Sequence, residues 1–590
     1  MSNIENSNIE KEDHGIDNGS NNSNFNSPFI DANENDTTSD NDNDKEEIPQ
    51  SYDLEQQIEN QDYDELSRYE SNVAASRQLT RRSTGADKIM EAAKKITDPL
   101  PPMGGGRDYP PPLPDRSDYL VSFDGPNDPI HPHNFPLNKK ILYSALFGLN
   151  ALIISMGSAM FSAAGPIVGE LYHVGSAVTA LGTSLFVFGF ASGPVIWGPL
   201  CELFGRRLIL ICSSFGYVCF CFATACSENI QTVMITRFFS GFVGSSALVA
   251  APAAMADLFG VATRGRATAI FAMVLFGGPM LAPIISAFIV KNPNLNWRWT
   301  QYITGILAGL TFALNVLFLE ETHHPLILVN KAETLRRRTG NWGIAAPHEE
   351  VTLNFKEIVE NNLARPIVLL FTDPTLFLIT LYNAFIYGLL YLFLTAIPLI
   401  FQGNYHFAPG VAELPYLSMF IGIIIGGFVC IFFEERFKKV MIKNNGVPIP
   451  EERLPAMMVG SFFFCGGLFW LGWSGSYPET VHWIVPTIGA AFIGLGLITI
   501  FLPCINYIID CYIPTYQVAS AMAANTLLRS AFGAAFPLFA RQMFVNMQIK
   551  WAATLLGAFA ALLIPVPFLF YKYGGAIRAW NVKRLTKDRV

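Results

Sequence analysis

Long apolar segments separated by short polar breaks run through most of this chain. A helix needs about 20 apolar residues to cross roughly 30 Å of hydrocarbon, and the apolar segments between residues 141 and 571 are long enough to do so. They predict spanning helices at 141–165, 177–200, 208–226, 232–255, 268–290, 302–319, 374–401, 413–433, 456–474, 484–509, 516–540 and 551–571. Six precede and six follow the longest polar break, so we expect an all-α membrane protein with twelve transmembrane helices in two six-helix halves.

The same pattern divides the chain into regions. They are a disordered acidic cytoplasmic tail (1–100), a pre-membrane segment (101–140), the N-terminal half (141–319), a cytoplasmic central loop (320–365), the C-terminal half (366–573) and a cytoplasmic C-terminal tail (574–590). The first tail has almost no apolar side chains to offset the entropy of ordering its backbone. Its RRST run is a candidate kinase site, although a plain solvated linker explains it equally well. Residues 331–365 are a candidate amphipathic surface helix, with positive-inside charge as the alternative.

Composition and charge support a membrane protein with a defined orientation. The chain is 51% hydrophobic and 15% charged, with a mean hydropathy of +0.31, which excludes a soluble protein of this size. Residues 1–140 carry a net charge of −15, so the chain total of −8 leaves +7 for the remainder. Basic residues concentrate in the loops on one side of the predicted spans, and this bias places both termini in the cytoplasm.

Two arginines fall inside predicted spans, where an ionisable group costs at least a few kcal/mol. Arg237, in ITRFFSGFVG, is followed by small residues that let helices approach closely. It is either a group for proton coupling or substrate orientation, or a structural arginine bonded to backbone carbonyls. Arg529, in ANTLLRSAFG, has no acid within a helical turn. It either faces the substrate cavity or extends to an interface.

Acidic residues lie mainly at the ends of the predicted spans. A proton-coupled carrier needs a group whose pKa crosses the working range as access alternates, and Asp257 is our candidate for this role together with Arg237. Further carboxylate candidates are Glu413, Asp373 and Asp510. Glu320 and Glu321, directly after the sixth span, are candidates to meet a cationic substrate.

Polar and aromatic side chains gather on the seventh predicted span. Tyr382, Asn383 and Tyr387 interleave with other aromatic residues there. Aromatic faces with occasional hydroxyls suit flat amphiphiles or organic cations through stacking and cation–π contact. We therefore take these three residues as candidates for the substrate cavity, while plain helix packing explains any one of them equally well.

The loop after the second span reads GPLCELFGRR at residues 198–207, which resembles the signature loop of the major facilitator superfamily. Its place between the second and third spans makes the match more specific than the letters alone. In that family the acid and the arginines form a charge relay that steadies the outward-facing state. The resemblance carries this role to Glu202, Arg206 and Arg207, with glutamate where the family more often has aspartate. Gly198 and Gly205 are the matching glycines of the same gating loop.

Further segments narrow the resemblance. FGGPMLAPIISAF is similar to the Gly-Pro motif of proton antiporters at Gly278, Pro279 and Pro283, although Ala282 stands where glycine is common. RFFSGFVG, which contains Arg237, resembles a fourth-span motif associated with proton coupling. EETHHPLILVNKA and GAAFIGLGLITIFLPCINYIID, among others, resemble the fungal twelve-span drug:proton antiporters over residues 100–575. The likeness is closest to the polyamine exporters of budding yeasts and the fluconazole-resistance exporter of Candida-type yeasts.

The resemblance implies a carrier rather than an enzyme. It implies export of polyamines, amphiphilic drugs and toxicants in exchange for protons, and hence azole-type multidrug resistance. No cofactor and no nucleic acid are expected; the partners are substrates, protons and the lipid bilayer, and we expect a monomer. The plasma membrane is the expected location, with the vacuolar membrane as the alternative. A proton-independent facilitator or sugar-type carrier of the same fold is the competing interpretation.

Two observations limit other chemistries. The chain lacks a GxxxxGK[ST] phosphate-binding loop, so ATP is not the expected energy source. His323 and His324 are expected in a solvated loop, because two adjacent residues supply too few ligands for a metal site. We therefore expect no metal.

Overall fold

The computed structural model describes residues 119–125, 127–350, 364–444, 448–513 and 517–587. All of these described residues belong to one compact unit. The expected disordered tail, its RRST run and the first part of the pre-membrane segment lie outside the described residues.

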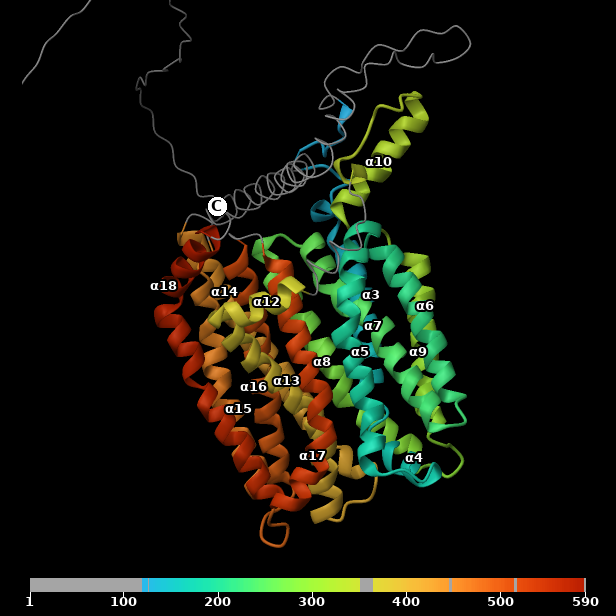
Figure 1. Cartoon of the computed structure of the whole chain (residues 1–590), viewed down its shortest axis with the longest axis vertical. Helices are drawn as coiled ribbons and strands as arrows, with labels where there is room; N and C mark the ends of the chain where they lie inside the picture. Colours follow the sequence, from blue (N-terminus) through green and yellow to red (C-terminus); the bar gives the residue numbers. More distant parts are fainter. Residues whose placement is uncertain (1–118, 126, 351–363, 445–447, 514–516, 588–590) are drawn as a thin grey trace, which may run out of the picture. The chain divides into compact units, whose positions relative to one another are not determined.

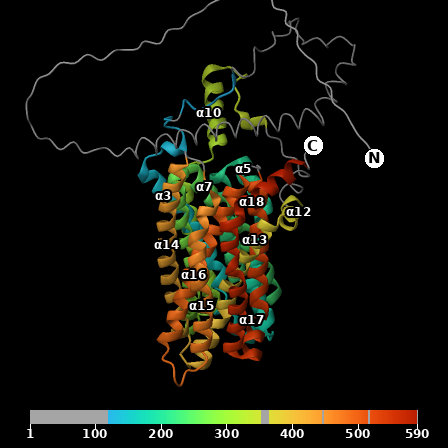
Figure 2. The ribbon, with the colours of Figure 1, turned by 90° about the vertical axis from the view of Figure 1, so that its left-hand side faces the viewer.

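Long apolar helices form the body of the described chain. In hydrocarbon every backbone polar group must be satisfied within the protein, and an α-helix does this within one segment. The long helices are α3 (Leu137–Ala159), α5 (Ser176–Phe204), α6 (Arg206–Ala225), α7 (Ile230–Leu258), α8 (Val261–Lys291), α9 (Arg298–Phe318), α13 (Pro374–Pro398), α14 (Pro415–Lys443), α15 (Leu454–Ser474), α16 (Ile484–Tyr512), α17 (Val518–Leu563) and α18 (Pro565–Lys587). Figure 1 shows α3–α9 and α12–α18 as two neighbouring groups, and Figure 2 shows the long helices running in a common direction.

The number of spanning segments agrees with the twelve predicted from the sequence once the interruption of one long helix is taken into account. Among the described residues, eleven stretches are long and apolar enough to cross a membrane, and the last of them covers the 61 residues Val518–Arg578. A straight helix of that length would measure about 90 Å, three times the hydrocarbon thickness. The helix is interrupted at Gln548, which has a φ of 64° and a ψ of 153°. This break separates the two predicted spans, 516–540 and 551–571, and the predicted fold class is confirmed.

Two helix pairs make the most extensive contacts between the halves: α5 packs against α17, and α8 packs against α14. Within the N-terminal half, α5 and α7 approach so closely that a Cβ at Gly241 would lie 2.0 Å from the carbonyl oxygen of Phe186. Only glycine allows this distance, because any larger residue would separate the helices. The small residues that follow Arg237 in the sequence therefore fulfil the predicted packing role.

Short elements complete the described structure. They are η3 (Pro132–Asn134), α4 (Gly165–Leu171), α10 (His324–Thr339), η4 (Pro347–Glu350), α12 (Arg365–Thr372), the π-helix η6 (Leu399–Asn404), η7 (Val411–Glu413) and η8 (Pro450–Arg453). We call the end of the bundle that carries α10 the linker end, and the other end the opposite end (Figure 1).

The helix in the central loop differs from its prediction over residues 331–365. It begins at His324 and ends at Thr339, because Gly340 adopts a left-handed conformation with a φ of 69° and closes the last turn onto Arg336. Arg336 forms a two-pronged ion pair with Glu349. Residues 351–363 of the predicted helix lie outside the described residues.

Candidate functional site

Aromatic side chains from both halves meet in the middle of the bundle. Phe276 of α8 lies edge-to-face with Phe501 of α16, with ring centroids 4.5 Å apart. Tyr387 lies 6.3 Å from Phe276 and 5.3 Å from Tyr391, both measured between ring centroids. All four rings are buried. We call Phe276, Tyr387, Tyr391 and Phe501 the central aromatic cluster.

A buried arginine lies against this cluster. The guanidinium carbon of Arg529 is 4.8 Å from the ring centroid of Tyr387 and 5.2 Å from that of Phe501. The Nε of Arg529 is buried without a hydrogen-bond partner among the described residues. Of the two predicted positions, the structure therefore places Arg529 toward the interior and not at an interface. An unpaired donor of this kind is available to a ligand acceptor.

One hydrogen bond crosses between the halves beside the cluster. The hydroxyls of Ser158 in α3 and Tyr391 in α13 are 3.1 Å apart. Nearby, the Asn383 amide donates to the side-chain oxygen of Asn525 at 2.9 Å, which binds α13 to α17. Tyr382 is buried among the C-terminal helices. The candidates of the seventh span thus divide: Tyr387 belongs to the cluster, whereas Asn383 connects two helices of one half.

Arg237 is fully buried and binds three backbone carbonyls. Its Nε donates to Gly182 at 2.9 Å, and its two terminal nitrogens donate to Gly157 at 2.8 Å and Ser158 at 3.0 Å. The guanidinium carbon also lies 4.4 Å from the ring centroid of Phe186. This single side chain joins α7 to α3 and α5, which is the geometry of the structural alternative. A part in proton coupling is compatible with it and remains a proposal.

The signature loop is held by partners from distant parts of the chain. The Nε of Arg206 lies 3.3 Å from a carboxylate oxygen of Asp257. The backbone N–H groups of Arg206 and Arg207 donate to the two oxygens of Glu321 at 2.9 and 3.1 Å. Glu321 thereby caps α6, where the first N–H groups lack partners within the helix. The Glu202 side chain is exposed.

Glycine is required at the turn between α5 and α6. Gly205 has a φ of 82°, and a Cβ there would lie 2.3 Å from the Glu321 carboxylate. Gly198 has open space around it. Glu320 forms an ion pair with Lys139 at 2.7 Å. Glu320 and Glu321, two candidates for contact with a cationic substrate, are thus engaged at the linker end and lie outside the central cluster.

The Gly-Pro motif lies where α8 meets α3. A Cβ at Gly278 would lie 2.1 Å from the hydroxyl of Ser155 and 2.7 Å from the backbone nitrogen of Met156. Pro279 and Pro283 lie inside α8, where each removes one backbone donor from the helix. The motif therefore combines a close helix contact with a locally weakened helix, and it begins two residues after Phe276 in α8.

Four histidines bind the ends of α5 and α7, contrary to the expectation of a solvated loop. His323 and His324 are buried. Their Nε2 atoms lie 3.0 Å from the Glu202 carbonyl and 2.9 Å from the Asp257 carbonyl, respectively. The Nε2 atoms of His133 and His348 lie 3.3 Å from the Ala256 carbonyl and 3.2 Å from the Leu203 carbonyl. We call these four the histidine clasp; it supplies donors to terminal carbonyls that have none within their helices.

Burial holds His133, His323 and His324 of the clasp in their neutral form. Desolvation, with the nearby Arg206 charge, lowers the pKa of His323 to about 2. Desolvation also lowers the pKa of His324 to about 4. The pKa of His133 falls to about 4 because of desolvation and of the nearby His324. A neutral imidazole has one N–H, which the carbonyl acceptors place on Nε2. Within the described residues, no three His, Cys, Asp or Glu side chains gather as metal ligands.

Acid is expected to weaken the clasp. The native pKa of His324 lies below the ordinary value of 6.5, so the unfolded chain binds more protons and stability falls as pH drops below 6.5 toward 4. Each such histidine contributes up to about 1.4 kcal/mol per pH unit over that window. His324→Gln keeps a neutral donor and should reduce the decline of apparent Tm between pH 7.5 and 5.5, measured on the purified full chain. An unchanged decline would show that the clasp does not titrate.

A second arginine at the linker end holds the C-terminal half. The Nε of Arg453 lies 2.9 Å from Asp510, and its terminal nitrogen pairs with Glu434. Asn506 donates to the other Glu434 oxygen at 3.0 Å, and the guanidinium carbon lies 3.6 Å from the ring centroid of Phe437. Arg453, Asp510 and Phe437 are buried, and Glu434 and Asn506 are half-buried. The sequence analysis did not select Arg453, which follows two glutamates in the run PEER at residues 450–453.

The two halves also meet at the linker end. Arg266 of α8 forms an ion pair with Glu435 of α14, and a Cβ at Gly265 would lie 2.4 Å from the Glu434 carboxylate. Asp373, another carboxylate candidate, accepts from the backbone N–H of Thr375 at 2.8 Å and so caps α13. The candidate carboxylates Asp257, Asp373 and Asp510 therefore all act in contacts at helix ends.

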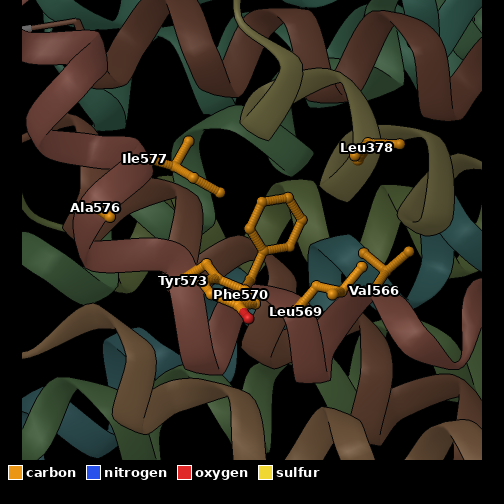
Figure 3. Close-up of a pocket in the computed structure, with 7 residues that line it drawn as sticks. All are labelled: Leu378, Val566, Leu569, Phe570, Tyr573, Ala576 and Ile577. Atoms are coloured by element: carbon orange, nitrogen blue, oxygen red, sulfur yellow. The ribbon is translucent and has the colours of Figure 1, made fainter.

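A hollow of about 540 Å³ lies apart from the central cluster, between α13 and α18 (Figure 3). Its lining residues are Leu378, Val566, Leu569, Phe570, Tyr573, Ala576 and Ile577. Three of them, Leu378, Leu569 and Tyr573, are among the exposed large apolar residues of the bundle. The hollow thus belongs to the apolar outer surface of two spanning helices.

Comparison with known proteins reveals extensive similarity. The family model of the Major Facilitator Superfamily matches residues 147–537. The chain is 62% identical over 515 residues to the major facilitator superfamily multidrug transporter FLU1 of Candida albicans, covering 87% of this chain and 84% of that one. It is 47% identical over 514 residues to the multidrug transporter TPO1_2 of Candida glabrata, covering 87% and 88%.

Solved structures share the fold at low identity. The crystal structure of the human organic anion transporter MFSD10 aligns with a TM-score of 0.53 at 14% identity, covering 73% of this chain and all of that chain. A partially occluded inward-open structure of the xylose transporter XylE from E. coli aligns with a TM-score of 0.51 at 16% identity, covering 74% and 98%. These two similarities concern the fold alone.

Proposed function

Because this chain belongs to the major facilitator superfamily, we propose that it is a proton-coupled exporter whose preferred cargo is aromatic, amphiphilic drugs and toxicants. The two halves rock about a site near the middle of the membrane and expose it to each side in turn. The relatives named as multidrug transporters support this class of cargo.

The central aromatic cluster is the observation that carries the proposal. It draws rings from α8, α13 and α16, so it lies where the halves must separate during transport. Flat aromatic cargo can replace the ring contacts that break when the halves part, and such ring pairs contribute about 0.5–1.5 kcal/mol each beyond their burial. The unpaired Nε of Arg529 can donate to an acceptor on the cargo.

The charges around the central aromatic cluster favour uncharged aromatic drugs over polyamines as cargo. The helices α3, α8, α13 and α17 contain no Asp or Glu, and Asp510, the single acid in α16, lies two residues from its end. A cationic substrate between the halves would therefore meet the buried guanidiniums of Arg237 and Arg529 with no carboxylate nearby to balance their charge. In a low-dielectric interior this repulsion is strong. We infer that polyamines are exported less well than uncharged aromatic compounds.

Orientation follows from the basic residues at the linker end. Lys139, Arg206, Arg264 and Arg266 lie at the linker-end termini of their helices, so we assign this end and both chain termini to the cytoplasm. We propose the plasma membrane as the location, with the vacuolar membrane as the alternative, and a monomer as the working unit.

Asp257 is our candidate for linking a proton to this end. Protonation would remove the negative charge that holds Arg206, and so would loosen the contact between α6 and α7. Arg237 would transmit that change, because it binds α7 to α3 and α5. This assignment adds Asp257 to the charge relay that the resemblance placed on Glu202 and the two arginines of the signature loop.

The experiment is efflux from yeast cells that lack their own exporters and express the full chain. Cells loaded with a fluorescent azole or with radiolabelled spermidine are compared with and without a protonophore. We expect protonophore-sensitive efflux with a higher rate for the azole. Efflux insensitive to the protonophore would indicate a facilitator, and a preference for spermidine would contradict the role of the central cluster.

Removing the charge beside the cluster should change this ranking. Arg529→Gln keeps a hydrogen-bond donor but removes the cation that repels charged cargo. We expect the ratio of spermidine to azole efflux to rise about tenfold, which corresponds to about 1.4 kcal/mol. Arg298→Gln is the matched control, because Arg298 donates to the Ser227 carbonyl at the opposite end. An unchanged ratio in Arg529→Gln would remove Arg529 from the cargo site.

A further inference from the structure

The halves also touch at the opposite end, through the short helix η7 and the end of α8. Gly410, directly before η7, has a φ of 92°, and a Cβ there would lie 3.2 Å from the Phe288 ring. Ala412 and Ile289 are buried in the same apolar cluster. This contact joins the C-terminal half to the N-terminal half at the end that the proposed orientation places outside the cell.

One carboxyl group is buried at this contact. Glu413, the last residue of η7, is 6% exposed, and its Oε2 has no hydrogen-bond partner among the described residues. The elements packed against η7 are α8, α13 and η6. The contact therefore encloses an acid that the apolar surroundings do not stabilise as an anion.

The titratable groups around Glu413 offer it no buried cation. Tyr416 of α14 interacts with the carboxyl, and its own hydroxyl donates to the Phe393 carbonyl at 2.8 Å. Lys291, at the end of α8, and His406, after η6, are exposed. The other titratable groups on the packed elements are the α13 tyrosines Tyr382, Tyr387 and Tyr391, the arginines Arg264 and Arg266 at the far end of α8, and Tyr405, which donates to the Ser474 and Val481 carbonyls.

Burying an unpaired carboxylate is far more costly than burying the neutral acid. The closed contact therefore requires Glu413 to carry a proton. When η7 separates from α8, water reaches the side chain, and a hydrated glutamate ionises with a pKa of about 4.3. Closing thus takes up one proton from the side to which this end opens, and opening returns it.

We propose that Glu413 is a proton-linked latch of the external gate: the gate closes only with Glu413 neutral, so acid outside the cell favours closure after cargo has left. The proposal rests on the alternating access and orientation of the proposed function. The latch makes closure of the external gate depend on external pH. It does not require Glu413 to carry a proton across the membrane.

The test measures opening of the gate directly. Ile289→Cys places a thiol on α8 at the contact, in a Cys226→Ser background, because Cys226 is exposed at the end of α6. The full chain in liposomes, at equal pH on both sides and without cargo, is treated with a membrane-impermeant maleimide between pH 5 and 7. The same labelling of Glu413→Gln cancels the pH dependence of the thiol itself.

We expect the ratio of labelling with Glu413 to labelling with Glu413→Gln to rise with pH, by up to about tenfold per unit, because each unit changes the ionised fraction tenfold. Glu413→Asp should retain the rise. A ratio that stays flat over this range overturns the latch. If Glu413→Gln does not fold, the exposed Cys226 of the unsubstituted chain supplies the reference rate instead.

Failure here is distinct from failure of the proposed function. The labelling uses no cargo and no gradient, so a flat ratio removes the latch and leaves drug export untouched. Conversely, a pH-dependent ratio in a chain that moves no drug would retain the latch and contradict the cargo assignment.

Discussion

Replacing Arg237 with alanine is expected to abolish export. The change leaves the carbonyls of Gly157, Ser158 and Gly182 without their donors. Each buried unsatisfied group costs about 1–3 kcal/mol, so we expect a total loss of several kcal/mol at the junction of α3, α5 and α7. The measurements are the apparent Tm of the purified chain and the initial rate of azole efflux.

Arg237→Lys separates geometry from charge. Lysine keeps the positive charge, but its single ammonium cannot reproduce the planar fork that reaches three carbonyls. We expect it to recover a minor part of the stability and of the rate. A stable Arg237→Ala chain whose efflux ignores a protonophore would instead support the coupling role. Normal, protonophore-sensitive export by Arg237→Ala would contradict both roles.

Arg453→Met should have the second largest effect. It leaves Glu434 and Asp510 at the linker end without their shared cation. Removing one partner of a buried ion pair costs about 3–5 kcal/mol, because the remaining charge is uncompensated. We expect a marked fall in apparent Tm and at least a tenfold lower efflux rate, since α14 and α16 also contribute to the contacts between the halves.

Two controls define the origin of this effect. Combining Arg453→Met with Glu434→Gln and Asp510→Asn removes all three charges, and should restore most of the stability. Arg337→Met breaks the exposed pair with Glu333 on α10, and should cause no measurable loss, because solvent screens such pairs. A single Arg453→Met chain as stable as the unsubstituted one would show that the network contributes little.

The sequence predicted the spans well because their cause is local. A run of about 20 apolar residues has few alternatives in a bilayer. Each of the first eleven predicted spans lies on a long helix of the structure, and the twelfth, 551–571, covers the last part of α17 and the start of α18. The shift in the central helix also has a local cause: the left-handed Gly340 ends it at Thr339. Gly340 was visible in the sequence, whereas its conformation was not.

The partners within the site were harder to predict because they are distant in the chain. Arg206 pairs with Asp257, 51 residues away, and its backbone N–H with Glu321, 115 residues away. The signature loop suggested the nearby Glu202 instead. His323 and His324 form adjacent polar positions typical of a loop, and only the packing of the central loop onto α5 and α7 buries them.

The most direct measurement is azole transport by the purified full chain in liposomes with an imposed pH gradient. Vesicles in which the linker end faces the azole are given a more acidic solution on the opposite side. Proton exchange predicts uphill azole movement toward the acidic side, which reverses when the gradient is reversed and stops when it is collapsed. Azole that only equilibrates across the membrane, whatever the gradient, would contradict proton-coupled export.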